Sequence, residues 1–298
     1  MAAAAVHHHL PRSYQLRFSV AGRVWVFDRV TKRFRQDTPR NVAAARDDYT
    51  IRHADGRMDS RVETEFLSRL DDRGAVLLEK LNARSQITMD EKEDFSWYLA
   101  FSLVRGPRFK RMLNEIGTAM WKSYTRSELQ TEEAIREMIE ECPHFSADER
   151  AAADPALLLE MIQSEDYTMA LNRDYAVKLM MDHGAQLRHL FLESDWVVGH
   201  ASRSTEFVTS DSPIVTLGSV RAFPLGHDSC LMMVPGSGDR IAHRDMPDEM
   251  VHQTNLDTAR QAERTVIGTE DYLRRVVAES RIDVEDPAPI AGVEPPSV

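Results

Sequence analysis

Residues 23–28 read Arg-Val-Trp-Val-Phe-Asp, and this stretch decides the predicted fold. β-branched and aromatic residues fill it, which is typical of a β-strand. Because Trp25, Val26 and Phe27 are apolar without alternation, we expect this strand to be covered on both faces. A second strand is predicted over residues 14–19, and Ala21-Gly22 between the two predicts a hairpin.

The spacing of apolar residues becomes helical from Glu63 and predicts a helix that ends near Ala83. Thr88-Met-Asp-Glu91 is a capping box that starts a second helix. That helix should break at Gly106-Pro107, because proline has no amide donor. Further helices are predicted over residues 109–124, 129–141, 155–164 and 167–193, with a loop over 140–154.

Strand-like segments return after Ser194, at residues 196–201, 206–209, 213–217 and 230–234, before a closing helix over 256–279. Strands and helices are thus segregated along the chain, which predicts an α+β fold. We expect a mainly helical body with a small, mostly antiparallel sheet built from the N-terminal strands and those of the C-terminal third. The prediction is a single domain over residues 1–282 and a disordered, acidic, proline-rich tail over 283–298.

The distribution of charge suggests a local anion site. The net charge is −11, which argues against a protein that coats nucleic acid through bulk electrostatics. Residues 12–40 nevertheless carry eight basic and two acidic residues, and residues 103–126 carry six basic and one acidic residue. The alternative is that these strips are solvated faces or pair with the acidic helices.

No apolar run approaches the roughly 20 residues that cross a membrane. The chain also lacks a basic opening typical of a secretory signal, so we expect a cytoplasmic protein. The two cysteines, Cys142 and Cys230, are far apart and form no CxxC pair, which favours free thiols. No metal site is predicted, and no cofactor is indicated.

Histidines cluster at the start of the chain, at His7, His8 and His9. Histidine titrates near neutral pH, so one of them could act as a general acid or base. A metal site is less favoured, because side chains alternate along a strand and only His7 and His9 would share a face. The alternative is an exposed polar segment.

A second polar motif, Thr209-Ser210-Asp211, ends a predicted strand just before Pro213. The carboxylate could orient a histidine, or Ser210 could be a nucleophile, although no Gly-x-Ser-x-Gly elbow surrounds it. The alternative is a turn in which Ser210 and Asp211 satisfy backbone amides.

Two further charged residues stand out. Glu63 lies near a helix start, where the helix dipole alone favours an acid. Arg105 lies in an apolar helix at its break, so it either pairs with a buried acid or meets an anionic ligand.

The opening motif His7-His8-x-Leu10-Pro11-Arg12-x-Tyr14, followed by Gly22-x-Val24-Trp25-Val26-Phe27-Asp28-Arg29, resembles a known family. It is similar to the start of the bacterial domain of unknown function 4238 family. The blocks 39–50, 63–81, 101–109 and 207–213 resemble the same family. His9 departs from it, since an aromatic residue is usual there. The resemblance implies no activity, but it marks these polar positions: His7, His8, Arg12, Glu63, Arg105, Ser210 and Asp211.

The leading hypothesis is a hydrolase or transferase acting on a phosphate-bearing substrate, either nucleic acid or nucleotide. His8 would move the proton, Asp211 would orient it, and Ser210 and Glu63 would be further catalytic residues. Substrate binding is predicted for the remaining polar positions: His7, Arg12, Tyr14, Arg105 and Thr209. Two alternatives remain: a non-catalytic nucleic-acid- or protein-binding module of a bacterial defence or mobile-element system, or buried structural networks.

Overall fold

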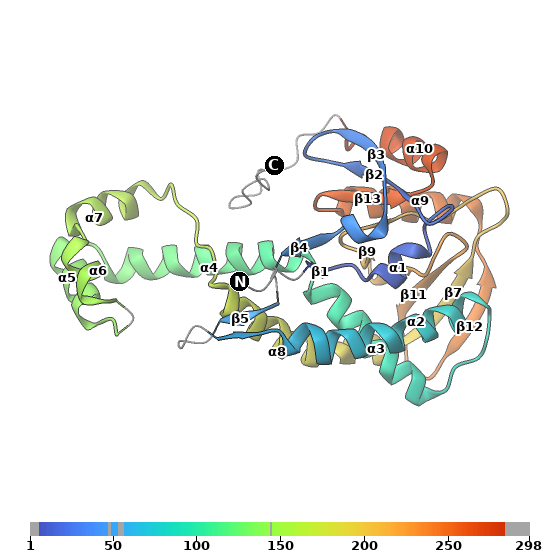
Figure 1. The fold of residues 1–298 in the computed structure, drawn as a ribbon, viewed down its shortest axis with the longest axis horizontal. Coiled ribbons are helices and arrows are strands. Elements are labelled where there is room, and N and C mark those ends of the chain that lie inside the picture. The colour runs from blue at the N-terminus through green and yellow to red at the C-terminus, as the bar shows by residue number, and fades with distance from the viewer. Residues whose placement is uncertain (1–5, 47–48, 53–56, 144, 284–298) are drawn as a thin grey trace. The chain divides into compact units, whose positions relative to one another are not determined.

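The computed structural model describes residues 6–46, 49–52, 57–143 and 145–283 (Figure 1). The described parts of Met1–Lys110 and Arg173–Pro289 form one compact unit, here the sheet unit. Residues Arg111–Asn172 form the other, here the helical unit. The single domain predicted over residues 1–282 stays a prediction, and residues 284–298 of the predicted tail lie outside the described residues.

A four-stranded antiparallel sheet joins the two ends of the sheet unit, in the order β3-β2-β13-β8. Its strands are β2 (Val24–Asp28), β3 (Arg33–Asp37), β8 (Thr209–Ser210) and β13 (Thr265–Gly268). The apolar stretch Val24–Asp28 forms the inner strand β2. Val26 packs in one apolar cluster and Phe27 in another, so β2 is covered on both faces as predicted.

A second, five-stranded sheet has the order β12-β7-β11-β10-β9. Its strands are β7 (Ser194–His200), β9 (Val215–Leu217), β10 (Val220–Pro224), β11 (Ser229–Pro235) and β12 (Ile241–Asp245). All its neighbours are antiparallel except the parallel pair β7–β12. The sheets are therefore mostly antiparallel as predicted, but they are two rather than one.

Short strand pairs complete the sheet unit: β1 (Val6–His8) with β4 (Ala44–Arg46), and β5 (Ile51–Arg52) with β6 (Met58–Asp59). Its helices are α1 (Arg12–Leu16), a π-helix (Val62–Leu67), α2 (Ser68–Asn82), α3 (Met89–Val104), α8 (Arg173–Leu192), α9 (Asp248–Gln261) and α10 (Glu270–Ser280), with a 3₁₀ turn at Pro39–Asn41. The predicted α+β fold class is confirmed.

The helix signals hold in detail. The Thr88 side chain accepts from the Glu91 amide while the Glu91 carboxylate accepts from the Thr88 amide, so the capping box is formed. Helix α3 ends at Val104, and α4 (Pro107–Glu128) begins at the proline. Helices α5 (Glu132–Glu141), α6 (Ala147–Ala152) and α7 (Pro155–Ser164) follow.

Several boundaries were wrong. Residues 14–19 are not a strand, because Tyr14 and Gln15 lie on the short helix α1, and the hairpin is instead β2–β3. The helix predicted over 256–279 is interrupted by β13, whose Val266 and Ile267 are buried in different clusters. The loop predicted over 140–154 contains α6, and the strand over 206–209 shrinks to β8.

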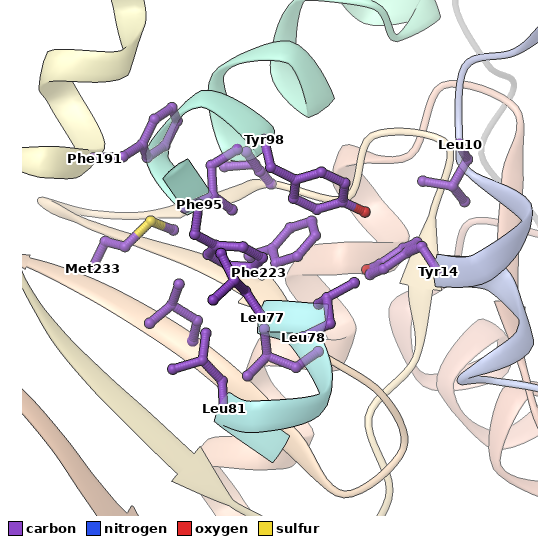
Figure 2. Packing of buried hydrophobic residues seen from close by; sticks show 14 of the residues in the cluster. Leu10, Tyr14, Leu77, Leu78, Leu81, Phe95, Tyr98, Phe191, Phe223 and Met233 are labelled. Atoms are coloured by element: carbon purple, nitrogen blue, oxygen red, sulfur yellow. The ribbon is translucent and has the colours of Figure 1, made fainter. Parts of the chain in front are cut away.

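Aromatic residues fill the core of the sheet unit (Figure 2). Phe223 on β10 meets Tyr14 with ring centroids 5.0 Å apart, Tyr98 at 6.2 Å and Phe95 at 6.3 Å. Helices α3 and α8 approach closely because Gly184 has no side chain. A Cβ there would lie 2.6 Å from the Phe101 ring, so only glycine fits this crossing.

Candidate active site

The Asp211 carboxylate lies in the sheet unit and is occupied by backbone amides. It is 2% exposed and accepts from the amides of Glu263 (2.9 Å), Arg264 (2.8 Å) and Thr265 (3.0 Å). Burial raises the pKa of Asp211 to about 6, and the three amide donors oppose that rise. These contacts fix the chain that enters β13, so the amides that Asp211 satisfies are remote in sequence and not those of the local turn that was the alternative.

The hydroxyl groups of Ser210 and Thr209, next to Asp211, also form hydrogen bonds within the protein. Ser210 Oγ donates to the Ser212 carbonyl at 2.9 Å and accepts from the Ser212 amide at 3.2 Å. Tyr14 donates to the Pro224 carbonyl at 2.8 Å and lies 2.8 Å from Thr209 Oγ1. The opening segment and the Thr209-Ser210-Asp211 motif thus meet, through a buried network.

Arg105 forms a buried ion pair with an acid that the sequence did not single out. Its Nη1 donates to Asp71 Oδ1 on α2 at 2.8 Å, and its guanidinium lies 5.7 Å from the Tyr98 ring centroid. Its carbonyl accepts from the Tyr49 hydroxyl at 3.0 Å. In the described part of the chain, Arg105 Nε has no hydrogen-bond partner.

His8 ends β1 and lies close enough to Asp71 for its charge to lower the pKa of that carboxyl. Burial outweighs this effect and that of Arg105, so the pKa of Asp71 is raised. We call His8, Asp71 and Arg105 the acid–base cluster. Glu63 lies on the π-helix that leads into α2, and such helices occur frequently at functional sites. The side chain of His7 lies outside the described residues.

Two exposed arginines lie beside the opening segment. The β1–β4 register pairs His8 with Ala44, and the Gln15 side-chain amide then donates to both Leu10 O (2.7 Å) and Val42 O (3.0 Å). Helix α1, which begins at Arg12, contacts the 3₁₀ turn that contains Arg40. Both arginines are exposed.

Comparison with known proteins gives one match. The family model for proteins of unknown function (DUF4238) matches residues 6–271, most of the 298-residue chain. The chain belongs to the DUF4238 family. None of the curated proteins and none of the solved structures that were compared matches it. The DUF4238 match includes every residue of the acid–base cluster, but it brings no activity with it.

Metal ligands, thiols and membrane-spanning helices were also considered in this DUF4238 chain. Among the described residues, no three His, Cys, Asp or Glu side chains converge as metal ligands. Cys142 and Cys230 are free thiols, as predicted. None of the helices in the described ranges combines the length and apolarity needed to traverse a lipid bilayer.

A signal for Asp71 was present in the sequence. Helix α2 buries Gly74, Leu77, Leu78 and Leu81, and Asp71 lies three and seven residues before Gly74 and Leu78 on the same side. Asp71 occupies a position on the apolar side of α2, and Arg105 follows the apolar helix α3. Two opposite charges on the apolar sides of neighbouring helices predict a buried ion pair between them. The buried acid expected as one alternative for Arg105 is therefore Asp71.

A histidine pair on β7 and β12 forms a second titratable cluster. His200 Nε2 lies 3.1 Å from His243 Nδ1, with the rings stacked and their centroids 5.3 Å apart. Burial lowers the pKa of His200 to about 4, helped by the charges of Arg84 and His243 and opposed by Asp245 and Asp228. Burial also lowers the pKa of His243. Both rings are therefore neutral at pH 7.

This pair should make the fold sensitive to acid. A lowered pKa stabilises the folded state fully above the unfolded value of about 6.5, and this stability is lost as pH falls towards 4. We expect His200→Gln to reduce the loss of unfolding free energy between pH 7 and pH 4.5 by about 1 kcal/mol, allowing for solvent screening. Urea unfolding at several pH values measures it. Parallel pH curves for both proteins would contradict this assignment.

Proposed function

We propose that this DUF4238 protein is a hydrolase or transferase acting on a phosphate-bearing substrate, a nucleotide or nucleic acid, with His8 as the proton-transfer group. One observation carries the proposal: a buried arginine holds the Asp71 carboxylate, and His8, from a remote part of the chain, comes near enough for its charge to act on that carboxyl. Asp71 and Arg105 are a positioned pair, and such perturbed carboxyls gather at functional sites.

Asp71 takes the orienting role that was predicted for Asp211. Both Asp211 oxygens already accept backbone amides, so this carboxylate has little capacity left for an imidazole. Asp71 accepts a hydrogen bond from Arg105, and its negative charge interacts favourably with a positive charge on His8. His8 would accept a proton from the attacking hydroxyl or water and return it to the leaving group.

Positive charge for the phosphate comes from the surface rather than from Arg105. The Arg105 side chain has no solvent exposure, whereas Arg12 and Arg40 are exposed on neighbouring segments next to β1. Guanidinium groups bind phosphate oxygens in bidentate fashion, which suits these two residues for substrate binding. Arg105 would act through Asp71, as a positioning residue.

The test is turnover by purified protein on single-stranded RNA, single-stranded DNA and nucleoside triphosphates, with and without chelator. We expect His8→Gln to lower the rate about 100-fold or more, because it removes the proton-transfer group. His189→Gln is the matched control, since this histidine is exposed on α8. Its rate should equal that of wild type, and both variants should keep the wild-type melting temperature.

Equal rates for His8→Gln and wild type on a turned-over substrate would contradict the assignment of His8. If wild type turns over none of these substrates yet binds RNA or DNA with strong salt dependence, the non-catalytic binding function is favoured instead. Arg12→Gln and Arg40→Gln should then weaken binding.

A further inference from the structure

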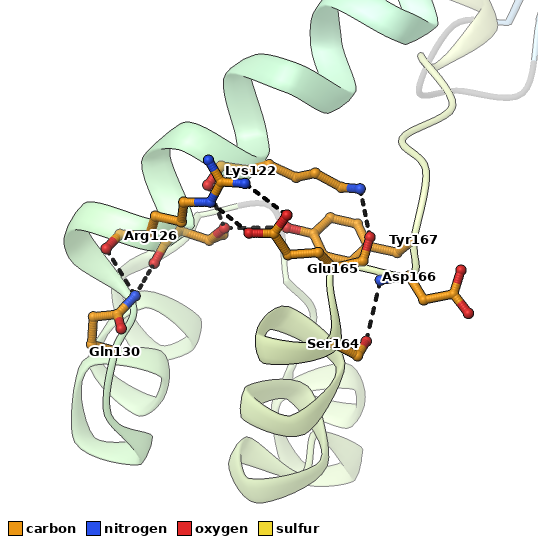
Figure 3. Close-up of polar contacts among 8 residues, drawn as sticks. Lys122, Arg126, Gln130, Ser164, Glu165, Asp166 and Tyr167 are labelled. Carbon is orange, nitrogen blue, oxygen red and sulfur yellow. Dashed lines mark hydrogen bonds and ion pairs between the residues drawn. The ribbon is translucent and has the colours of Figure 1, made fainter.

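The basic residues that the helical unit contributes to the predicted anion strip are bound within that unit. Arg111 pairs with Glu115 at 2.6 Å, and Lys122 donates to the Glu165 carbonyl. Arg126 binds the Glu165 carboxylate through two nitrogens, so the chain that follows α7 is held to α4 (Figure 3). This half of the strip therefore serves the packing of the helical unit, and the polar groups that bear on the acid–base cluster lie in the sheet unit.

Tyr98 on α3 places a hydroxyl group inside the core without an internal hydrogen bond. The residue is 1% exposed, and its hydroxyl has no hydrogen-bond partner among the described residues. The ring itself is well packed, since it stacks on Phe95 with centroids 5.3 Å apart and meets Phe223 at 6.2 Å. Phenylalanine would keep these ring contacts, and a buried hydroxyl without a partner costs free energy. Packing of the core therefore does not explain the hydroxyl.

A glycine on α2 brings the Tyr98 ring against the helix that carries Asp71. A Cβ at Gly74 would lie 2.2 Å from this ring, so only glycine allows the approach. Gly74 follows Asp71 by three residues, which places both on the same side of α2. The Arg105 guanidinium lies 5.7 Å from the Tyr98 ring centroid and donates to Asp71 at 2.8 Å. Tyr98, Arg105 and Asp71 thus occupy one place between α2 and α3.

The Tyr98 hydroxyl points away from α3 and toward the opening segment of the chain. Figure 2 shows its oxygen directed to the side where Leu10 and Tyr14 lie, and all three residues belong to one buried cluster. The Tyr14 hydroxyl is used differently, because it donates to the Pro224 carbonyl and lies 2.8 Å from Thr209 Oγ1. One buried tyrosine therefore joins elements through its hydroxyl, and the other does not.

The Tyr98 hydroxyl is protonated and can donate a hydrogen bond. Burial raises the pKa of Tyr98, the positive charge of Arg105 lowers it, the charge of Asp71 raises it further, and the Ser102 hydroxyl also opposes the rise. The net effect is a pKa above the ordinary value for tyrosine, so the phenol is neutral at pH 7. An ionised carboxylate is the strongest kind of acceptor for such a donor. The hydroxyl therefore favours the ionised form of Asp71 over the protonated form.

We propose that Tyr98 is a positioning residue of the acid–base cluster, and that its hydroxyl acts with Arg105 to keep the Asp71 carboxylate ionised for its interaction with His8. The proposal rests on the proposed function, in which Asp71 orients His8 during proton transfer. Burial raises the pKa of Asp71, Arg105 and His8 oppose that rise, and the neighbouring charge of Asp72 adds to it. Without the phenol, a larger share of this carboxyl would be protonated at neutral pH.

Carbon-13 NMR titration of the aspartate carboxyl groups in the full chain tests the link between Tyr98 and Asp71 without relying on turnover. The Asp71 signal is identified by its loss in Asp71→Asn. We expect Tyr98→Phe to raise the Asp71 midpoint by about 0.5 to 1 pH unit, a roughly three- to tenfold higher proton affinity. Tyr175→Phe is the matched control. It removes the same group from a 51% exposed residue of α8 and should leave the midpoint unchanged.

Thermal unfolding and turnover separate a positioning role from a structural one. The melting temperature of Tyr98→Phe should stay within about 2 °C of wild type, because the lost interaction with Asp71 is offset by the removal of a buried hydroxyl. Tyr14→Phe should lower it by about 5 °C, since that hydroxyl has two partners. On a substrate that wild type turns over, Tyr98→Phe should lower kcat about tenfold at pH 7 and move the acid limb of the kcat/KM profile to higher pH.

An Asp71 midpoint that Tyr98→Phe leaves unchanged would overturn the proposal. So would a melting temperature lowered as much as in Tyr14→Phe, because the Tyr98 hydroxyl would then have a structural partner. Turnover that depends on His8 but not on Tyr98 would refute the role of Tyr98 and keep that of His8. A raised midpoint in a protein that turns over none of the substrates would contradict the proposed function while confirming that Tyr98 keeps Asp71 ionised.

Discussion

Replacing Asp211 with alanine is expected to lower the free energy of unfolding by about 4 kcal/mol. The reason is that three backbone amides, those of Glu263, Arg264 and Thr265, lose their acceptor in a buried place. Each unsatisfied buried donor costs about 1–3 kcal/mol, and the three costs overlap because they share one carboxylate. Urea unfolding followed by circular dichroism measures the change.

Asp228→Ala is the control for Asp211→Ala, because Asp228 is an exposed aspartate in the same unit. It should change the unfolding free energy by less than about 0.5 kcal/mol. A loss below about 1 kcal/mol for Asp211→Ala would show that the amides find other partners. A change in turnover without any change in stability would return Asp211 to the catalytic role predicted from the sequence.

Lys92→Met should lower the unfolding free energy by about 3 kcal/mol. Lys92 lies on α3 and its side chain is fully buried. It donates to the carbonyls of Leu192 (2.8 Å), Ser194 (2.7 Å) and Gly238, and it lies 5.1 Å from the Trp196 ring centroid. Methionine keeps the apolar stem but leaves three carbonyls without a donor. Burial lowers the pKa of Lys92, and the negative charges of Asp195 and Asp239 oppose that shift.

The matched control is Lys178→Met on α8, where the lysine is exposed. It should be neutral within about 0.5 kcal/mol. Equal stability of Lys92→Met and wild type would contradict this prediction. It would mean that the free-energy cost of burying the ammonium equals the gain from its three hydrogen bonds, so that Lys92 does not stabilise the contact between α3 and β7. Chemical denaturation of both variants at pH 7 decides between these outcomes.

The helices were predicted well where a local signal sets their ends. Pro155 after Asp154 starts α7, and the predicted span 155–164 is the observed one. Strand β13 could not be predicted in this way, because Thr265–Gly268 is too short to show a period and lies between two helical patterns. It becomes a strand only because β2 and β8 supply partners on either side.

The candidate site shows the same limit. The sequence marked His8 and Arg105 by their chemistry and their place at element ends, but the acid between them depends on how α2 packs against α3. The Thr209-Ser210-Asp211 motif carries the residue types of a catalytic turn, and only its backbone partners reveal that the carboxylate supports a loop. Residue type alone cannot separate these uses of an aspartate.

The position of β13 has a consequence for biosynthesis. The hairpin β2–β3 is translated more than two hundred residues before β13, the strand that pairs with the other edge of β2. Until then β2 has a partner strand on one side only, the side of β3. Contacts between such remote segments form slowly, since a long loop must close first. The edge of β2 that pairs with β13 therefore stays unpaired through most of the synthesis, and unpaired strand edges of this kind are prone to aggregation.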